Sequence, residues 1–430
     1  MSILTTMLSA LRRTIHSDAF FNRSRVNETD FTRNRVLSFA KMITYIIWCA
    51  KTSLPSTLRF LLVDKLGGKE SCTRQAFSKR RRSIKPEALE ELFKLSMQIM
   101  VQKIKPEKDR LRILAVDGTK LDLPTHTELE KTYGIQKSTG NLPQALVSIL
   151  YDVEHRFVLD VQVRPHNGNE REMAHVHFKK LQTLLGSSDY LIIYDRGYPS
   201  GKLLETFSKA PGRYLMRCPK EFLPAIDKNK EDAWITHKFH SNKEAVSIRV
   251  IHAKLPNGNE EILCTNLSDE YTASELVDLY AERWSIEINY DFLKNRIQPE
   301  NLSGITACAF LQHLYACMLM CNLCAAYYND NRDWEAEAGS VPKLKLRRKK
   351  DDETILECNR RINMATVLAA IRSILPRVLA YPHSRLKTYL GSIAVQRLKN
   401  VFRYDKDGRN KTRVRIHPAL KFTQSQRQGF

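Results

Sequence analysis

The order of apolar runs between residues 111 and 195 constrains the fold of this chain more than any other feature. Leu111–Asp117 is a short apolar run that ends in an acid, and Ala145–Val153 and Phe157–Val163 resemble two further strands joined by a turn. Glu170–Leu185 has helical spacing, and Tyr190–Asp195 is another buried strand that ends in an acid. This order predicts an α/β sheet whose strands run in both directions.

Residues 200–270 interrupt the alternation and predict a β-rich insertion. Ala245–Ala253 alternates apolar and polar residues, Pro256–Asn259 supplies a turn, and Ile262–Thr265 resumes the strand pattern. An Asn-Gly pair between two such runs is a strong hairpin signal.

The segments on either side are predicted to be helical, because apolar residues recur at helical spacing within residues 1–105. After residue 300 we expect a charge-free helix, a basic linker at Val341–Lys350, a helix from Asp352 to Leu375 that Pro376 ends or kinks, and a basic tail at 403–427. Residues 71–85 form a basic segment that suits DNA phosphates, although a solvated helix face explains the same charges. Its cations are Arg74, Lys79, Arg80, Arg81, Arg82 and Lys85.

The charge of the chain favours a polyanionic partner. Its 430 residues, enough for two or three domains, carry 69 Lys and Arg against 47 Asp and Glu, a net charge of +22. Nucleic acid is the first candidate partner and an anionic membrane surface the second, while general solubility is the alternative explanation.

Residues 301–329 contain no Asp, Glu, Lys or Arg and are long enough to span a bilayer. Several polar residues interrupt the run, so a buried helix of a soluble protein is the better prediction. The nine Cys follow no disulfide framework, which fits a reducing cytoplasm, and the C-x-x-C at Cys321 and Cys324 is expected to be core packing.

Two acids, Asp117 and Asp195, follow predicted strands, where α/β sheets commonly present functional groups. A third comes from a predicted helix between residues 274 and 295. At about 100° per residue, Tyr280, Arg283, Glu287 and Lys294 fall on one narrow charged stripe between apolar flanks. The flanks include Trp284 and Ile288 on one side, and Glu282, Ser285 and Asn289 form the expected solvent face.

A charged stripe between apolar flanks carries Glu287 into a packed region, and a buried charge needs a partner. A metal ion or a substrate phosphate would supply one. An internal row of salt bridges between Arg283, Glu287 and Lys294 is the alternative explanation.

Taken together, these motifs resemble the DDE transposases of bacterial insertion sequences, in the insertion-sequence-four family. The family's Tyr-x2-Arg-x3-Glu-x6-Lys signature, the YREK motif, matches at every spacing from Tyr280 to Lys294. Asp-Gly-Thr stands at Asp117, and Asp-Arg-Gly-aromatic stands at Asp195. The resemblance covers roughly residues 20–330.

The resemblance implies a ribonuclease-H-like catalytic domain at 106–300, an N-terminal helical DNA-binding domain at 1–105 and a C-terminal helical region at 301–430. Asp117, Asp195 and Glu287 would be catalytic and hold two Mg²⁺ ions, with Mn²⁺ as a substitute. Tyr280, Arg283 and Lys294 would hold the terminal phosphate.

The implied reaction is cut-and-paste transposition. The enzyme would act on double-stranded DNA, on terminal inverted repeats and target, as a homodimer in the cytoplasm rather than in a membrane. Some members pass through a DNA hairpin with a flipped base. Trp234 is the candidate to receive that base.

Other assignments remain open at this stage. A ribonuclease-H-like nuclease without strand transfer and an inactive DNA-binding relic are the rival functions. A cluster of His and Glu residues around the start of the predicted helix at 170 is a weaker metal candidate; it comprises His166, Glu170, Glu172, His175 and His177. Asp122 and Asp160 are expected to be ordinary exposed acids.

Overall fold

The computed structural model describes most of the chain. The described residues are 1–33, 36–48, 53–105, 110–136, 141–185, 190–219, 222, 231–240, 244–254, 260–302, 304–332, 359–383, 385–386, 388–391 and 401–404. The expected turn at Pro256–Asn259, the linker at Val341–Lys350, the first residues of the helix expected from Asp352 and nearly all of the basic tail lie outside them.

Backbone contacts divide the chain into two compact units. The helical unit comprises residues 1–100, 301–304 and 308–430, and the sheet unit comprises residues 101–300 and 305–307. The segments expected to form separate N-terminal and C-terminal domains therefore belong to one unit.

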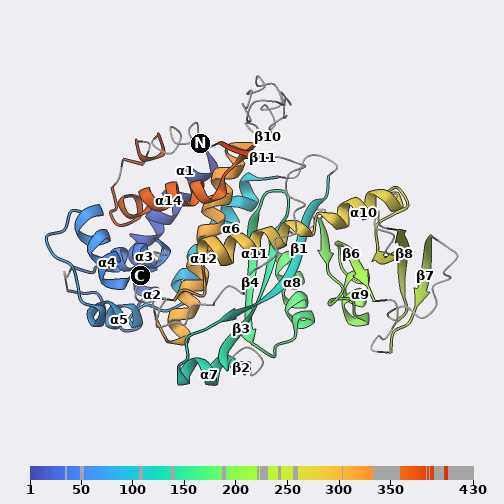
Figure 1. Ribbon diagram of the computed structural model, residues 1–430, viewed down its shortest axis with the longest axis horizontal. Coiled ribbons are helices and arrows are strands. Elements are labelled where there is room, and N and C mark those ends of the chain that lie inside the picture. The colour runs from blue at the N-terminus through green and yellow to red at the C-terminus, as the bar shows by residue number, and fades with distance from the viewer. Residues whose placement is uncertain are drawn as a thin grey trace, which may run out of the picture. The chain divides into compact units, whose positions relative to one another are not determined.

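The helical unit is built mainly from helices (Figure 1). Its elements are α1 (Ile3–Ile15), α2 (Asp18–Ser24), α3 (Phe39–Trp48), α4 (Leu54–Arg59), the π-helix η1 (Phe60–Lys65), α5 (Arg74–Arg82), α6 (Glu87–Lys103), α12 (Ala307–Asn329), the short strands β10 (Asn359–Ile362) and β11 (Val401–Tyr404), and α14 (Met364–Leu379).

Helix α12 is the charge-free run, and it is a core helix. It is long and apolar enough to cross a membrane, but 78% of its most apolar window is buried inside the chain. Its polar residues are satisfied internally, since Asn322 Nδ2 donates to Ser96 Oγ at 3.1 Å. Cys321 and Cys324 are buried thiols that form no disulfide within the described chain, as expected for core packing. The described residues of its own chain therefore cover most of this apolar run.

Pro376 lies inside α14, which continues to Leu379 rather than ending at the proline. Proline has no N–H, so the carbonyl of Arg372, four residues earlier, loses its helical partner. Trp48 Nε1 donates to that oxygen at 3.0 Å. This hydrogen bond satisfies the acceptor and joins α3 to α14.

The described residues of the sheet unit form nine strands and six helical segments. The strands are β1 (Arg112–Asp122), β2 (Ile135–Gln136), β3 (Leu142–Asp152), β4 (Phe157–Pro165), β5 (Tyr190–Tyr194), β6 (Arg213–Cys218), β7 (Asp232–His237), β8 (Val246–Lys254) and β9 (Glu260–Thr265). The helices are α7 (Thr127–Tyr133), α8 (Glu170–Leu185), α9 (Gly201–Ser208), α10 (Ala273–Ala281), α11 (Trp284–Phe292) and the π-helix η3 (Leu293–Ile297).

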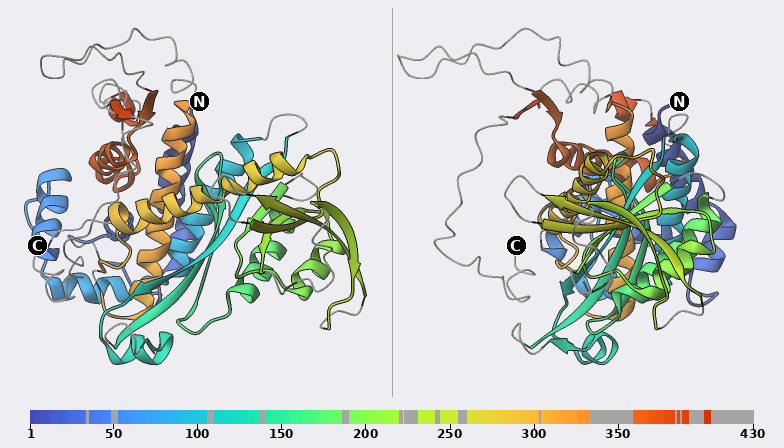
Figure 2. Two further views of the ribbon diagram at one scale, coloured as in Figure 1. Left: turned by 45° about the vertical axis from the view of Figure 1, so that its right-hand side comes forward. Right: turned by 90° about the vertical axis from the view of Figure 1, so that its right-hand side faces the viewer.

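The nine strands form one twisted sheet (Figure 2). Its order is β4-β3-β1-β5-β6-β9-β8-β7, with β2 also paired to β3. Strands β1, β5 and β6 are parallel, and the other pairings are antiparallel. The predicted mixed α/β sheet is confirmed. The region 200–270, expected to be a β-rich insertion, contains β6–β9 and continues this sheet, since β6 pairs with β5 and the antiparallel strands β7–β9 extend it.

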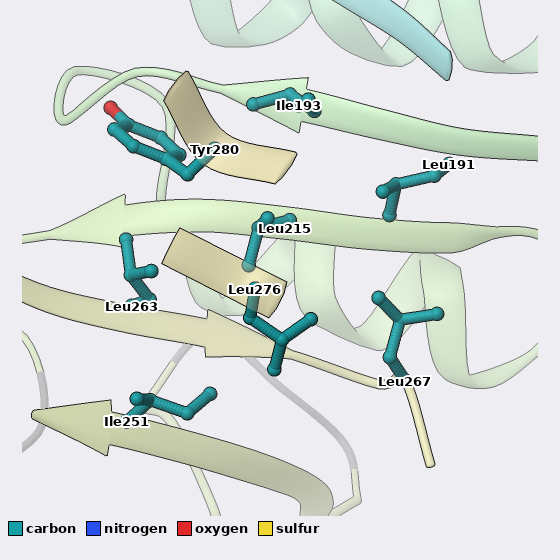
Figure 3. Packing of buried hydrophobic residues seen from close by; sticks show 8 residues of the cluster. All are labelled: Leu191, Ile193, Leu215, Ile251, Leu263, Leu267, Leu276 and Tyr280. Atoms are coloured by element: carbon teal, nitrogen blue, oxygen red, sulfur yellow. The ribbon is translucent and has the colours of Figure 1, made fainter. Parts of the chain in front are cut away.

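Helices cover both faces of the sheet. Residues of β5, β6, β8 and β9 pack with α10 on one face (Figure 3), in a cluster of Leu191, Ile193, Leu215, Ile251, Leu263, Leu267, Leu276 and Tyr280. The alternate residues of the same strands face α8 and α9, where Tyr194 and Tyr214 contact the ring of Phe207 and Phe207 contacts Phe178.

Candidate active site

Asp117 and Asp195 stand at adjacent positions on neighbouring parallel strands. Val116 and Tyr194 are the last aligned residues of β1 and β5. Asp117 is the next residue of β1, and Asp195 is the first residue after β5. β5 ends there, whereas β1 continues to Asp122 with β3 as its partner. The edge of β1 beyond Val116 is therefore open on the β5 side, and both acids border it.

Asp117 is a half-buried acid with no cation in contact among the described residues. Its Oδ1 accepts the N–H of Gly118 at 2.8 Å, and no Lys, Arg or His nitrogen among the described residues lies within 4.0 Å of its carboxylate. Burial raises its pKa to about 6, and the like charges of Glu170 and Asp195 add to the effect, against the Gly118 N–H and Arg283.

Asp195 is held by a residue of α10, the helix that packs on one face of the sheet. Its Oδ1 accepts the N–H of Arg196 at 2.6 Å and the hydroxyl of Tyr280 at 3.2 Å. The ring of Tyr280 belongs to the apolar cluster on the sheet (Figure 3), so packing fixes the direction in which its hydroxyl points. A capping box of Thr272 and Glu275 begins α10.

Glu287 lies on α11 in an ion pair with Arg283, whose Nη2 donates to Glu287 Oε1 at 2.8 Å. Arg283 is 6% exposed, and its guanidinium lies over the rings of Tyr280 and Trp284 at 6.0 and 5.5 Å. Burial alone would lower the pKa of Arg283, but Asp195, Tyr280 and Glu287 raise it above its ordinary value. Arg283 thus links the third acid electrostatically to the second.

The predicted continuous helix is interrupted on both sides of the third acid. Glu282 and Arg283 separate α10 from α11, and their N–H groups donate three residues back, to Leu279 O and Tyr280 O. Lys294 lies beyond α11 in the π-helix η3 and is half-buried. A tighter turn before Glu287 and a wider one after it change the angular positions that a regular helix predicts.

The expected faces of this helix are consequently wrong. Asn289 was placed on the solvent face but is 6% exposed, whereas Trp284 and Ile288, placed on an apolar flank, are 61% and 69% exposed. Glu282 is exposed as predicted. The side chain of Ser285 lies outside the described residues. An exposed Trp therefore directly follows Arg283 and precedes Glu287 by three residues.

Glu170, which the sequence analysis named only within the weaker His and Glu metal candidate, lies beside the first acid. Its carboxylate lies against Gly118, and its Oε2 accepts the hydroxyl of Tyr198 at 3.2 Å. The sequence offered one indication of this placement, which is that Glu170 begins the helix α8 directly after strand β4. The pattern of apolar residues gave no indication that this helix starts beside Asp117.

The other members of the His and Glu cluster point to different partners. His166 Nδ1 contacts Tyr133 O at 3.1 Å, and His175 Nδ1 contacts Thr206 Oγ1 at 3.5 Å. His177 is fully buried between Asp160 Oδ2 at 2.8 Å and Ser148 Oγ at 3.1 Å. These side chains hold α8 in place and do not form a metal site together.

The expectation that Asp122 and Asp160 are exposed was wrong. Asp122 is 3% exposed and accepts a hydrogen bond from Gln144 Nε2 at 2.6 Å. Asp160 is 9% exposed and accepts from His177, Gln162 and Lys180. Both acids are paired within the fold, which removes the cost of burying them.

The acids around the open edge of β1 fit a divalent cation by their chemistry. Asp117, Asp195 and Glu170 offer oxygen ligands alone, the type that Mg²⁺ prefers, and a cation would offset a buried charge that lacks a protein partner. In the described part of the chain, no three His, Cys, Asp or Glu side chains are already grouped around a single metal position.

The basic segment of the helical unit forms α5, and its cations differ in exposure. Arg74, Lys79, Arg82 and Lys85 are exposed. Arg80 is half-buried over the ring of Phe31 at 4.7 Å. Arg81 is 4% exposed and donates to Gln312 Oε1 at 2.7 Å and Ala309 O at 2.8 Å on α12. Arg81 therefore anchors the helix and is not available to a phosphate in this structure.

Comparisons with known proteins show the family and the fold of this chain. The family model of the transposase DDE domain matches residues 108–323, half of the chain. The chain belongs to this transposase family. No curated protein matches the transposase. Among solved structures it is similar to piggyBac transposase in a synaptic complex with hairpin DNA, at 9% identity and a TM-score of 0.51. That likeness covers 90% of this chain and 84% of the other, and the shared fold is ribonuclease-H-like.

Proposed function

We propose that this transposase cleaves the ends of a mobile element and joins them to target DNA, with Asp117, Asp195 and Glu287 as its catalytic acids. The observation that carries the proposal is the register of β1 and β5, which brings two acids together at an open sheet edge. The match of the transposase DDE domain supports it, because that match spans all three acids. We also propose membership of the insertion-sequence-four family, on the YREK spacing from Tyr280 to Lys294.

The three acids would hold two Mg²⁺ ions, or Mn²⁺ in their place. A bound cation would relieve charge on the attacking and leaving oxygens of the phosphodiester. Tyr280 orients Asp195 through its hydrogen bond, and Arg283 restrains Glu287 through the ion pair. Arg283 and Lys294 would contact the terminal phosphate once DNA is bound.

DNA binding would use the exposed cations of α5 in addition to the active site. Arg74, Lys79 and Arg82 point away from the core, while Phe77 and Arg81 hold the helix in place. The duplex partners would be terminal inverted repeats and target DNA in the cytoplasm. Two copies would act together in the synaptic complex, in parallel with the complex described for piggyBac transposase.

A hairpin intermediate is part of the proposal, because the piggyBac structure holds hairpin DNA. Trp234 on the outer strand β7 is 44% exposed, and its Nε1 donates to Asp269 Oδ1 at 2.8 Å. Its exposed ring keeps it a candidate to receive a flipped base.

The test is a cleavage and joining assay with full-length protein, Mg²⁺, a duplex carrying the inverted repeats that flank the gene, and a target plasmid. Asp117→Asn, Asp195→Asn and Glu287→Gln should abolish cleavage and leave DNA binding intact. Glu282→Gln is the matched control, since Glu282 is an exposed acid near the same site, and it should cleave normally.

The rival functions give different products in the same assay. Nicked ends without joined plasmid would identify a nuclease that lacks strand transfer. Binding without cleavage by the unaltered protein would identify an inactive relic. Full cleavage by any of the three acid variants would remove that residue from the site.

A further inference from the structure

The start of α8 is fixed against the motif of the second acid. Asn169 Oδ1 accepts the N–H groups of Arg171 at 2.9 Å and Glu172 at 3.4 Å, which caps the helix. Arg171 Nε donates to the carbonyl of Gly197 at 2.8 Å, two residues after Asp195. The first residue of α8, Glu170, is therefore held beside the catalytic strands by contacts other than its own.

The carboxylate of Glu170 fills the space beside the first acid. A Cβ atom added to Gly118 would lie 2.7 Å from Glu170 Cδ and 2.8 and 2.9 Å from its two oxygens. Only a glycine after Asp117 leaves room for a carboxylate in this position. Because β5 has ended, Glu170 can reach the open edge of β1 from the α8 face, while Asp195 borders it beside α10.

Glu170 also lacks a compensating charge. Among the described residues its one hydrogen bond comes from the neutral hydroxyl of Tyr198, and no Lys, Arg or His nitrogen there lies within 4.0 Å of its carboxylate. Glu170 is half-buried, and it stands with Asp117 and Asp195, which also lack a cation in contact. Gathering like charges is unfavourable unless a cation joins them.

We propose that Glu170 is a fourth carboxylate of the metal site and binds a divalent cation together with Asp117 and Asp195. This inference rests on the proposed function of that site. Glu287, which is already paired with Arg283, remains the third acid of the proposed site. The sequence Asp-Gly at 117–118 is then explained, since the glycine admits the additional ligand.

A purely structural role for Glu170 makes a different prediction. If the carboxylate serves only as the acceptor for Tyr198, then Glu170→Gln, which keeps an acceptor oxygen, should change nothing. If the carboxylate binds a cation, the loss of its charge should weaken that cation's affinity whatever happens to the hydrogen bond.

The experiment is titration of the full-length, DNA-free protein with Mn²⁺, followed by calorimetry and by the electron paramagnetic resonance signal of free Mn²⁺. Glu170→Gln should bind Mn²⁺ about tenfold more weakly or worse. Glu170→Asp keeps the charge but shortens its reach, so it should also bind more weakly. Tyr198→Phe, which removes a hydrogen bond that orients the carboxylate but keeps its charge, should weaken Mn²⁺ binding less than Glu170→Gln does.

If Glu170→Gln folds and binds Mn²⁺ with unchanged affinity, the inference is overturned. If Glu170→Gln does not fold, unchanged Mn²⁺ affinity in Glu170→Asp overturns it. Asp117→Asn in the same titration separates this failure from that of the proposed function. If Asp117→Asn loses Mn²⁺ binding and Glu170→Gln does not, the inference alone fails. If neither loses it, the proposed metal site fails as well.

Discussion

The hydroxyl of Tyr290 donates a 2.6 Å hydrogen bond to the main-chain carbonyl of Asp117. Tyr290 follows Glu287 by three residues on α11, so this contact joins the helix of the third acid to the strand of the first. Both groups are removed from solvent, since Tyr290 is 7% exposed. The distance between Asp117 and Glu287 thus depends on a hydrogen bond between the side chain of Tyr290 and the main chain of Asp117.

Tyr290→Phe should therefore affect both stability and catalysis. The change leaves a buried carbonyl without its donor, which costs about 1–2 kcal/mol. It also releases α11 from β1, so the rate of DNA cleavage should fall further than the stability change explains. Urea unfolding and single-turnover cleavage, measured on the same preparation, test both expectations.

Tyr194→Phe is the matched control. Tyr194 is fully buried, and its hydroxyl has no hydrogen-bond partner in the part of the chain that the structure describes. Removing that hydroxyl should leave stability unchanged or slightly higher. A loss of cleavage in Tyr194→Phe equal to that in Tyr290→Phe would contradict the special role of the Asp117 contact.

Asp117→Asn should stabilise the metal-free transposase. The carboxylate is half-buried, lacks a cation in contact among the described residues and stands near Glu170 and Asp195. Removing its charge should raise the free energy of unfolding in EDTA near pH 8 by on the order of 1–3 kcal/mol. The variant should gain no further stability from Mg²⁺, whereas the unaltered protein should. Thermal unfolding with and without Mg²⁺ measures both effects, and a destabilised variant in EDTA would contradict the description of this site.

The first two acids could be predicted from the sequence because they depend on strands. The apolar runs before Asp117 and Asp195 predict buried strands, and parallel strands of one sheet align their ends. The sheet also follows from this pattern. The continuation of the sheet through β6 to β9 could not be predicted, because alternation shows that a strand exists and leaves its partner open.

The third acid and Glu170 show where sequence patterns stop being sufficient. A helical wheel assumes one regular helix, and the break at Glu282 and Arg283 changed which side chains are exposed around Glu287. Glu170 could be assigned to the start of a helix but not to the space beside Gly118, which is set by the contacts of Arg171 and Asn169. Both failures concern tertiary packing rather than local propensity.

Arg81 and Arg82 are adjacent on α5 but should respond to substitution in opposite ways. Arg81→Ala removes the buried donor to Gln312 Oε1 and to the carbonyl of Ala309, so it should destabilise the protein by about 2–3 kcal/mol. Arg82→Ala removes an exposed cation, so stability should stay within about 0.5 kcal/mol. DNA affinity should fall in Arg82→Ala, and the slope of log affinity against log salt should decrease by about one.

Chemical denaturation and DNA binding at several salt concentrations measure this contrast. DNA affinity should be compared at a temperature where both variants are folded. An unchanged salt slope in Arg82→Ala would remove α5 from the proposed DNA-binding surface, and an undiminished stability in Arg81→Ala would contradict its role as an anchor.

Gly118 and Gly197 belong to the motifs of the first and second acids but should tolerate alanine very differently. A Cβ at Gly118 would lie 2.7 Å from Glu170 Cδ, whereas a Cβ at Gly197 would have no heavy atom within 4 Å. Neither glycine has a positive φ, so backbone strain does not distinguish the two.

Gly118→Ala should displace the Glu170 carboxylate and weaken Mn²⁺ binding about as much as Glu170→Gln does. Gly197→Ala should bind Mn²⁺ normally. In a Glu170→Ala background the added methyl group meets no carboxylate, so Gly118→Ala should there cost little further Mn²⁺ affinity or stability. An equal loss of affinity in both backgrounds would mean that the glycine is needed for a reason other than the space it leaves for Glu170.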